Sequence, residues 1–448
     1  MTEAVVVLAA GKGTRMQSRV PKVLHTLCGT PMISYVIDVA KTTKCSQTIL
    51  VVPKDNLEIK KVVGDSVAYS VQERPLGTGD ALMSAKKLLK GHKDLIVISA
   101  DVPLLSKDLL NSLRYTHHDT HAVATVVTAQ VGSPEGFGRI IRDSKGNIED
   151  IVEHSEASKE QLNITEINAG IYMFDTAWLW DSLSELTISK SGEVYITSLF
   201  RNACLKKHTV SDVVAIDQVA VLGINDQEHL SLAENYIRER INRTFMLQGI
   251  RMIDPKTVYI DSGVSISKDT VIKPNTHVSG KTIIGSGCIL GPNTVINNSI
   301  VGNDCVIESS YVYDSKVKNG VSIGPFSNIR SQSVLDDQVR VGNFTEIKNS
   351  QVGKSSRILH LSYIGDAEIG KDVNIGAGTI TCNYDGKVKS HTKIGDGALI
   401  GSNTMIVAPV NIGIGAQTGA GSVVTKDVPP GATVIGIPAR IKKEVREE

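Results

Sequence analysis

An aliphatic residue at every sixth position is the feature of this 448-residue chain that most restricts its fold. The period is strict over residues 260–296 and again over 394–412. With slips, it also includes Val306, Val312, Ile323 and Ile364. Six residues match neither the period of an α-helix nor that of an alternating strand, but they are typical of a hexapeptide β-helix. We therefore predict that the second half winds into a left-handed parallel β-helix, with three short strands per coil and one inward aliphatic residue per hexapeptide.

Three segments of the second half are expected to interrupt this rhythm, and insertions in repeat folds commonly carry function. They are residues 330–348, residues 360–363, and residues 381–386 with the lysines that follow. Arg330 and Lys348 could bind a phosphate, and the imidazole of His360 can accept a proton near neutral pH. On residue type alone, exposed cations and a structural histidine explain the same residues.

The first half opens with a continuous apolar run, residues 5–8, followed by Gly11 and Gly13 with Lys12 and Arg15 among and after them. Such a run predicts a strand buried on both faces, as in a parallel sheet. Glycines let the following turn bring N–H groups around phosphate oxygens, and basic side chains neutralise the remaining charge. The spacing matches neither a Walker A loop nor a dinucleotide fingerprint. A nucleoside triphosphate site and a plain strand–loop turn therefore both remain open from these residues.

Two later segments also place polar groups where a parallel sheet binds ligands. Residues 71–79 bring glycines to the start of a predicted helix, and residues 95–99 form a predicted strand that runs into Asp101. A carboxylate there lies at the ligand-binding edge of an α/β sheet and suits Mg²⁺. A capping aspartate is the simpler alternative, and Asn225 in its loop could simply make a turn.

The composition restricts the remaining possibilities. The net charge of +1 indicates no surface for nucleic acid. The six cysteines include no C-x-x-C pair, so neither a zinc site nor a disulfide framework is predicted. No stretch is apolar for long enough to span a membrane, and we expect the cytoplasm. An amphipathic helix pattern separates the halves, so we expect an α/β domain over 1–225, a linker helix over 226–250 and the β-helix over 251–448.

The segment LAAGKGTRM, with Pro21 and Lys22 shortly after it, resembles the signature loop of sugar-1-phosphate nucleotidyltransferases. Further segments are ADVPL, INAGIY, GPF, VGNF, IGDAEIG, VNIGAGTITCNYDG and IGSNT. Together they resemble, over essentially the full chain, the family of bifunctional N-acetylglucosamine-1-phosphate uridylyltransferases and glucosamine-1-phosphate N-acetyltransferases. The resemblance implies a Rossmann-like, GT-A-like first domain and two reactions that make UDP-N-acetylglucosamine, a precursor of bacterial cell-envelope polymers.

For the first half, the resemblance implies a site for UTP and the UDP-sugar. Its residues would be Leu8, Ala9, Ala10, Gly11, Arg15, Lys22, Gln72, Gly77, Thr78, Gly138, Glu153, Asn168 and Asn225. Asp101 and Asn225 would hold Mg²⁺. Without the resemblance, Gly138 is expected to be a turn and Glu153 a solvated strand residue. The implied reaction depends mainly on positioning and charge neutralisation.

For the second half, the resemblance implies acetyl transfer from acetyl-CoA to glucosamine 1-phosphate with His360 as the base. Arg330, Lys348, Tyr363, Asn374 and Lys389 would bind glucosamine 1-phosphate. Ala377, Asn383, Tyr384, Ser402, Ala420 and Arg440 would bind acetyl-CoA, although the register of Arg440 after Pro438 is left open by the sequence. The family forms homotrimers through the β-helix, so a site shared between subunits is expected.

Two other functions compete with this interpretation. The first is a nucleotidyltransferase whose β-helix serves only assembly or regulation, and His360 and the Asn383–Tyr384 segment argue against it. The second is a sugar-nucleotide sensor without activity. Lys22, Asp101 and Asn225 argue against a sensor because they fit catalysis.

Overall fold

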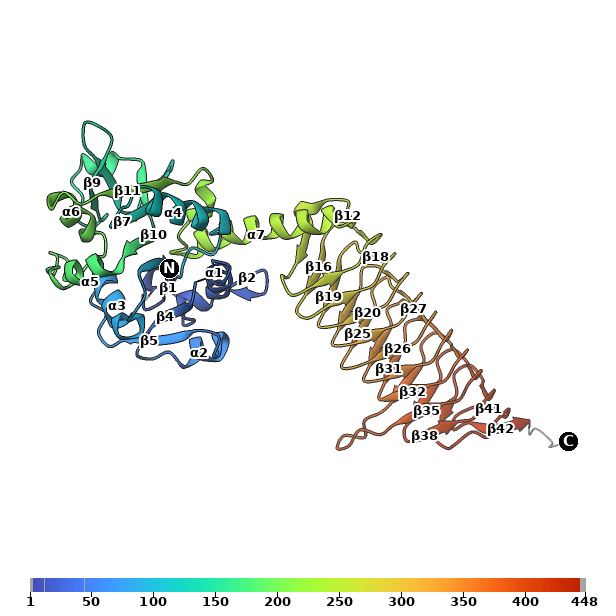
Figure 1. Cartoon of the computed structure of the whole chain (residues 1–448). Helices are drawn as coiled ribbons and strands as arrows, with labels where there is room; N and C mark the ends of the chain where they lie inside the picture. Colours follow the sequence, from blue (N-terminus) through green and yellow to red (C-terminus); the bar gives the residue numbers. More distant parts are fainter. Residues whose placement is uncertain (1–2, 12, 44, 444–448) are drawn as a thin grey trace. The chain divides into compact units, whose positions relative to one another are not determined.

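The computed structural model describes residues 3–11, 13–43 and 45–443 (Figure 1). Lys12, expected at the phosphate loop, lies outside these residues. The chain divides into two compact units, Met1–Ile237 and Arg238–Glu448, and the division falls within helix α7 (Gln227–Leu247). In the ranges described, no helix is both long enough and apolar enough to cross a membrane.

The first unit is built on one mixed sheet. Its main strands, in spatial order, are β11 (Val210–Val214), β7 (Ala124–Gln130), β10 (Glu166–Asp175), β6 (Asp94–Ser99), β1 (Glu3–Leu8), β4 (Gln47–Pro53) and β5 (Ala68–Gln72). Strand β10 is antiparallel to both of its neighbours, whereas β6, β1, β4 and β5 run parallel. A hairpin of β8 (Arg139–Arg142) and β9 (Ile148–Val152) pairs with β10, and β2 (Thr26–Leu27) pairs with β3 (Thr30–Pro31).

The apolar run at the start of the chain confirms the predicted buried strand. Val5, Val6 and Val7 of β1 are fully buried. Val5 and Val7 belong to the hydrophobic cluster on one face of the sheet, and Val6 belongs to the cluster on the other face. Such two-sided burial is the environment of a central parallel strand. The carboxyl ends of β1 and β6 therefore meet at one edge of the sheet, where Leu8 is in register with Ser99.

Helices cover both faces of this sheet. The α-helices are α1 (Met32–Lys41), α2 (Leu57–Val63), α3 (Thr78–Ser84), α4 (Lys107–Asp119), α5 (Thr176–Ser184) and α6 (Ser198–Leu205). The 3-10 helices are η1 (Thr14–Met16), η2 (Lys22–Leu24), η3 (Lys86–Leu89), η4 (Gln161–Asn163) and η5 (Gln218–Val221). The α1 and α4 helices pack on the face of Val5, whereas α3, α5 and α6 pack on the face of Val6.

The second unit is a parallel β-helix whose strands form three sheets, stacked coil on coil in Figure 1. The first sheet contains β12 (Arg251–Met252), β15 (Val271–Ile272), β18 (Ile289–Leu290), β21 (Val306–Ile307), β24 (Ser322–Ile323), β27 (Arg340–Asn343), β30 (Arg357–His360), β33 (Asn374–Ile375), β36 (Leu399–Ile400), β39 (Gln417–Thr418), β41 (Thr433–Ile435) and the antiparallel β42 (Arg440–Lys443).

The second sheet contains β13 (Val258–Ile260), β16 (Thr276–Ser279), β19 (Thr294–Asn297), β22 (Tyr311–Tyr313), β25 (Asn328–Arg330), β28 (Glu346–Lys348), β31 (Tyr363–Gly365), β34 (Ile380–Cys382), β37 (Met405–Val407) and β40 (Val423–Val424). The third contains β14 (Ser265–Ile266), β17 (Ile283–Ile284), β20 (Ile300–Val301), β23 (Lys316–Val317), β26 (Val334–Leu335), β29 (Gln351–Val352), β32 (Ala367–Ile369), β35 (Thr392–Ile394) and β38 (Val410–Ile412). A 3-10 helix, η6 (Pro255–Thr257), precedes β13.

The inward aliphatic residues confirm the hexapeptide prediction with one error. The strict runs point inward and form one continuous hydrophobic core. Val306, however, is 38% exposed, and Ile307 is the buried residue of β21. The inward residue after Ile296 is Val301, so the coil is one residue shorter there and the rhythm shifts.

Two of the three predicted breaks are also wrong. Residues 330–348 form a regular coil in which Arg330 is in register with Lys348. Residues 360–363 are regular as well, because His360 is in register with Asn343. Only the third break is an insertion. The chain leaves the β-helix after β34 and returns to it at β35. Strands β32 and β35 still pair across it, so the insertion lies outside the stacked coils.

Candidate active sites

A cavity of about 450 Å³ opens at the carboxyl ends of β1 and β6. Its lining includes the predicted residues Leu8, Ala9, Ala10, Gly11, Lys22, Gln72, Gly77, Thr78 and Asp101. The structure therefore brings the loop after β1, the segment before α3 and the end of β6 to one space, as expected for the ligand-binding edge of a parallel sheet.

Lys22 is the centre of the charged part of this site. Its Nζ donates to Asp101 Oδ2 at 2.6 Å and to Asn225 Oδ1 at 2.9 Å. Arg15 Nη2 also donates to Asn225 Oδ1, at 2.9 Å. The predicted metal ligands thus place two oxygen atoms around one cationic group. Oxygen donors of this kind suit a hard cation, so the residues fit Mg²⁺.

Gly13 explains how the loop after β1 reaches Lys22. Its φ angle of 58° lies in the left-handed region, which glycine adopts without steric cost. A Cβ atom at this position would lie 2.6 Å from Lys22 Cβ. The loop therefore depends on glycine both for its turn and for its close approach to Lys22.

The segment before α3 is held against a distant loop. Gly77 has φ 103°, and a Cβ atom there would lie 2.6 Å from the carbonyl oxygen of Val194. Thr78 Oγ1 accepts a hydrogen bond of 3.0 Å from the N–H of Ile196. Gln72 Nε2 donates to Gly77 O at 3.0 Å and to Asp80 Oδ2 at 2.8 Å, which leaves the carbonyl oxygen of its side chain as an acceptor. The residues expected to contact the base are thus rigidly placed.

Gly138, Glu153 and Asn168 form a separate group outside the lining of the cavity. The N–H of Asn168 donates to Gly138 O at 2.9 Å. A Cβ atom at Gly138 would lie 3.5 Å from both Asn168 Cβ and Glu153 Oε2, which is ordinary van der Waals contact and places the three residues side by side. Three residues that are distant in sequence therefore meet at one point.

Glu153 is not the solvated strand residue that its sequence context suggests. It follows β9, is half-buried, and accepts a hydrogen bond of 2.8 Å from Thr197 Oγ1. Burial raises the pKa of Glu153, and the hydrogen bond from Thr197 opposes that shift only in part. The carboxyl is therefore held in place by Thr197, next to Gly138 and Asn168.

In the second unit, the predicted phosphate-binding cations lie on neighbouring strands. Arg330 and Lys348 are register partners on β25 and β28. Arg330 Nε and Nη2 lie 2.7 and 2.6 Å from Glu346 Oε1. Lys389, from the insertion, contacts Lys348, and this neighbouring cation lowers the pKa of Lys389. Three positive side chains thus gather on one face, as an anionic ligand requires.

Asp366 ties the insertion to this face. Asn349 Nδ2 donates to Asp366 Oδ1 at 2.6 Å, and Asn383 Nδ2 donates to Asp366 Oδ2. Burial acts to raise the pKa of Asp366, but these two hydrogen bonds and the charges of Lys348 and Lys389 outweigh it and hold the pKa below its usual value. Asn383 is therefore oriented by a carboxylate that stays ionised.

His360 ends β30 with an exposed side chain. Its Nδ1 lies 3.1 Å from Asn343 Oδ1. If Nδ1 carries the proton that Asn343 accepts, Nε2 is left as the proton acceptor. Tyr363 follows on β31, where its hydroxyl covers Gly365, while Asn374 is exposed on β33. The hydrogen bond between His360 and Asn343 does not include Asn374.

Three of the residues expected at acetyl-CoA stack at the same corner of successive coils. Asn403 N–H donates to Ala377 O at 2.6 Å, and Gly421 N–H donates to Ser402 O at 2.8 Å, which places Ala420 in the next coil. Tyr384 is exposed in the insertion, whereas Asn383 is buried. The register of Arg440 is now defined, since it begins β42 opposite Ile435.

Sequence reasoning missed several residues at these sites. Thr14, Ser99 and Glu193 line the cavity, and Glu346 and Asp366 hold the charged groups of the second unit. Ser99 could have been found, because it ends the same strand that leads to Asp101. Glu193 could not, because it comes from a loop with no motif of its own.

Comparisons with known proteins match the two halves of the chain to different family models. A family model described as "Nucleotidyl transferase" matches residues 4–219. Three hexapeptide models match the second half: "Bacterial transferase hexapeptide (six repeats)" over 263–298, "GlmU-like, C-terminal hexapeptide" over 290–374 and "Hexapeptide repeat of succinyl-transferase" over 391–426.

Curated relatives match nearly the full length. "Bifunctional protein GlmU" of Halalkalibacterium halodurans is 43% identical over 441 residues, 98% of this chain and 97% of the relative. The proteins of the same name from Geobacillus sp. (strain WCH70) and Heliobacterium modesticaldum are each 44% identical, over 98% and 96% of this chain and 96% and 94% of the relatives. These matches confirm the resemblance drawn from the motifs, and the chain belongs to the family of bifunctional GlmU proteins.

Proposed function

We propose that this enzyme acetylates glucosamine 1-phosphate with acetyl-CoA and then transfers UMP from UTP to the N-acetylated product, releasing pyrophosphate. The observation that carries the proposal is the group formed by Lys22, Arg15, Asp101 and Asn225 at the cavity of a nucleotidyltransferase fold. Its GlmU relatives, named as bifunctional, match both halves.

In uridylyl transfer, an oxygen of the sugar phosphate attacks the α-phosphorus of UTP. The bond from that phosphorus to pyrophosphate breaks as the new P–O bond forms. Lys22 and Arg15 stabilise the negative charge on the phosphates. Asp101 and Asn225 would hold Mg²⁺, which supplies further charge neutralisation when bound.

The remaining predicted residues of the first unit position the two substrates. Leu8, Ala9, Ala10 and Gly11 let the backbone approach UTP. Gln72, Gly77 and Thr78 contact the uracil, and Gly138, Glu153 and Asn168 contact the N-acetylated sugar. Their tight packing supports this role, because fixed groups orient the reacting atoms without a further loss of entropy.

In acetyl transfer, His360 Nε2 accepts a proton from the ammonium group of glucosamine 1-phosphate, because an ammonium cannot attack a carbonyl. The free amine adds to the thioester carbonyl, and coenzyme A leaves as its thiol after protonation. Arg330, Lys348 and Lys389 bind the phosphate and sugar with Tyr363 and Asn374. Ala377, Asn383, Tyr384, Ser402, Ala420 and Arg440 form the acetyl-CoA side.

We also propose that the β-helix forms a homotrimer and that a neighbouring subunit completes each acetyl-transfer site. Phe326, Phe344 and Leu361 support this proposal, because they are 59, 57 and 64% exposed and lie at the same corner of successive coils beside His360. Exposed apolar side chains gathered in this way are typical of interfaces. The substrates and the free cysteines favour the cytoplasm.

Separate loss of the two activities tests the function. We expect His360→Ala to abolish thiol release from acetyl-CoA while uridylyl transfer continues, and Asp101→Asn to do the reverse. For the assembly, sedimentation should give a trimer. Full acetyltransferase activity in a stable monomer would contradict the shared site.

A further inference from the structure

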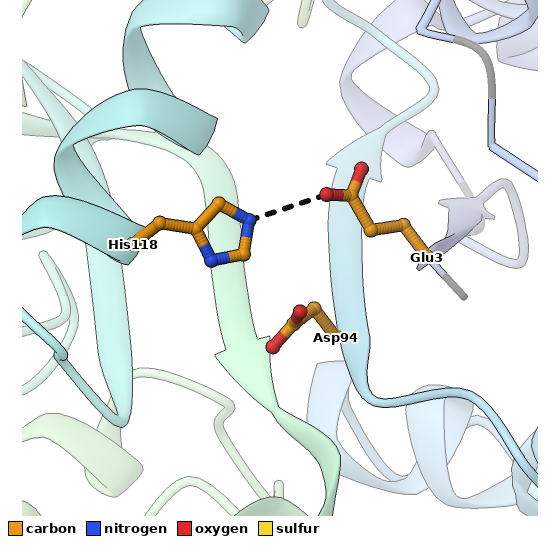
Figure 2. A group of neighbouring side chains, drawn as sticks. All are labelled: Glu3, Asp94 and His118. Atoms are coloured by element: carbon orange, nitrogen blue, oxygen red, sulfur yellow. Dashed lines mark hydrogen bonds and ion pairs between the residues drawn. The ribbon is translucent and has the colours of Figure 1, made fainter. Parts of the chain in front are cut away.

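Three potential metal ligands gather at the edge of the sheet opposite the nucleotide cavity. Glu3 begins β1, Asp94 begins β6, and His118 lies in the last turn of α4. One ligand atom of each lies within 4.8 Å of the others. Figure 2 shows the carboxylate of Asp94 below the gap between His118 and Glu3. The proposed Mg²⁺ ligand Asp101 follows the other end of β6, so this is a different place in the unit.

Asp94 is the member of this group whose carboxylate accepts no hydrogen bond at Oδ2 from the described part of the chain. The residue is only 2% exposed, and its Oδ2 is buried and accepts no hydrogen bond from the described residues. The nearest imidazole is His117, whose Nε2 lies 4.0 Å from Asp94 Oδ1. That distance is too long for a hydrogen bond, and the other ring nitrogen of His117, Nδ1, lies 2.8 Å from Thr125 Oγ1. A buried carboxylate oxygen without a donor is costly unless a ligand or a proton satisfies it.

Glu3 and His118 are available to share such a ligand. Arg114 Nε donates to Glu3 Oε2 at 2.7 Å, which orients the carboxylate and leaves Oε1 facing His118 Nε2 at 3.2 Å. His118 is partly exposed, with 32% of its side-chain surface accessible, so an ion can reach the group from solvent. A cation would replace the contact between Oε1 and Nε2 by bonds to both atoms.

We propose that Glu3, Asp94 and His118 form a binding site for a divalent transition metal of the Zn²⁺ type. Carboxylate oxygens and imidazole nitrogens are both ligands that Zn²⁺ takes in proteins, whereas Mg²⁺ prefers oxygen ligands alone. Three protein ligands leave a fourth position for water. The ion would link β1, β6 and α4, and so stabilise the first unit without taking part in either reaction.

The site can be tested on the full chain by equilibrium dialysis against Zn²⁺. The Asp101→Asn variant serves as background, because it removes the other proposed metal site. We expect one Zn²⁺ per chain in this background and loss of that equivalent when His118→Asn is added. The matched control is His121→Asn, since His121 is exposed and its positive φ of 52° suits asparagine. This control should keep the bound Zn²⁺.

Two further readouts separate a bound ion from a merely structural cluster. Co²⁺ should give visible absorption bands of a four-coordinate site, and these should vanish with His118→Asn. Zn²⁺ should raise the unfolding temperature followed by tryptophan fluorescence, because both tryptophans, Trp178 and Trp180, lie in α5 of the first unit. The proposal would be overturned if Zn²⁺ showed no saturable binding, or if His118→Asn left the binding unchanged. A proton, and not a metal ion, would then satisfy the carboxyl groups of Glu3 and Asp94.

Discussion

At the scale of single residues, Lys22 does most to organise the nucleotide site. One ammonium group bonds to both Asp101 and Asn225, and the side chain retains only 11% of its accessible surface. Removing it would leave Asp101 without its cation and would leave Arg15 as the remaining cation at Asn225 and at the phosphates. Charged donors aimed at the reacting phosphates are worth far more to the transition state than to folding.

We therefore predict that Lys22→Met lowers uridylyl transfer by about 10²–10³-fold. Pyrophosphate release and thiol release, measured on the same preparation, should show that acetyl transfer is unchanged, because Lys22 lies in the other unit. Lys54→Met is the matched control, since Lys54 is exposed and forms an ion pair of 3.6 Å with the exposed Glu73. Equal losses from both variants would remove Lys22 from its assigned role.

Gly13→Ala should act on the same site through the backbone. A non-glycine residue in the left-handed region costs about 1 kcal/mol, and the new Cβ must also push Lys22 aside. We expect a small fall in the tryptophan-monitored unfolding midpoint and a large fall in pyrophosphate release. Gly146→Ala shares the positive φ but has open space around it, so stability alone should fall there.

We predict that Glu153→Gln makes the first unit more stable and lowers its uridylyl transfer. A carboxyl whose folded-state pKa is raised stabilises the protein fully below its unfolded-state pKa, and that stabilisation is lost as the pH rises through the folded-state value. Glutamine does not ionise, so the variant does not lose this stabilisation as the pH rises. Above about pH 4.5, the ordinary pKa of a glutamate, the variant should therefore become increasingly more stable than the parent, while uridylyl transfer falls.

Unfolding midpoints between pH 5 and 8, again followed by tryptophan fluorescence, measure this difference. Glu160→Gln, at an exposed position before η4, is the control and should follow the parent, because Glu160 is not among the charges that shift the pKa of Glu153. If Glu153→Gln gave a difference that did not change with pH, burial of an ionisable carboxyl would not be the cause.

At the scale of elements, the coils of the β-helix show what the hexapeptide rhythm can and cannot predict. The rhythm identifies inward positions correctly wherever coils have equal length, as over 260–296. It fails at Val306 because a coil that is one residue shorter moves the inward position to Ile307. Both residues are aliphatic, so composition does not reveal the shift. Only the pairing of β21 with its neighbours does.

This pair of neighbours gives a direct stability test. Ile307→Ala should destabilise the second unit by about 2–5 kcal/mol, because it opens a cavity in a closed core. Val306→Ala should change stability by no more than about 0.5 kcal/mol, because Val306 faces solvent. Chemical unfolding followed by far-UV circular dichroism can compare the two. The opposite order would contradict the register of β21.

The insertion between β34 and β35 was predictable as an interruption but not as a structure. Its polar residues carry no period, and its position depends on contacts that are remote in sequence. Asn383 is fixed by Asp366 from the preceding coil, and Lys389 lies beside Lys348. Local pattern alone contains none of these contacts.

At the scale of the whole molecule, the fold and the sites need different kinds of evidence. Hydrophobic periodicity predicts the α/β class, the first strand and the β-helix. A strand buried on both faces needs a continuous apolar run, and inward stacking needs an aliphatic residue at each inward position. The sites do not follow in this way. Lys22, Asp101 and Asn225 come from separate segments, and only the fold brings them together.

Residue type alone also could not separate function from ordinary structure. Asp101 as a cap, Asn225 as a turn and Glu153 as a solvated residue were all reasonable from the sequence. The structure rejects the last of these and places the other two around Lys22. The roles of these residues remain predictions that the variants above can decide.

The most direct test of the central claim, two activities in one chain, is a staged assay with acetyl-CoA, glucosamine 1-phosphate and Mg²⁺, in which UTP is withheld and then added. We predict free thiol before UTP is added, followed by UDP-N-acetylglucosamine and pyrophosphate after it. Pyrophosphate release from supplied N-acetylglucosamine 1-phosphate without any thiol would contradict the account, and would leave a uridylyltransferase with a structural β-helix. Neither signal, from folded protein that binds UTP, would indicate a sensor instead.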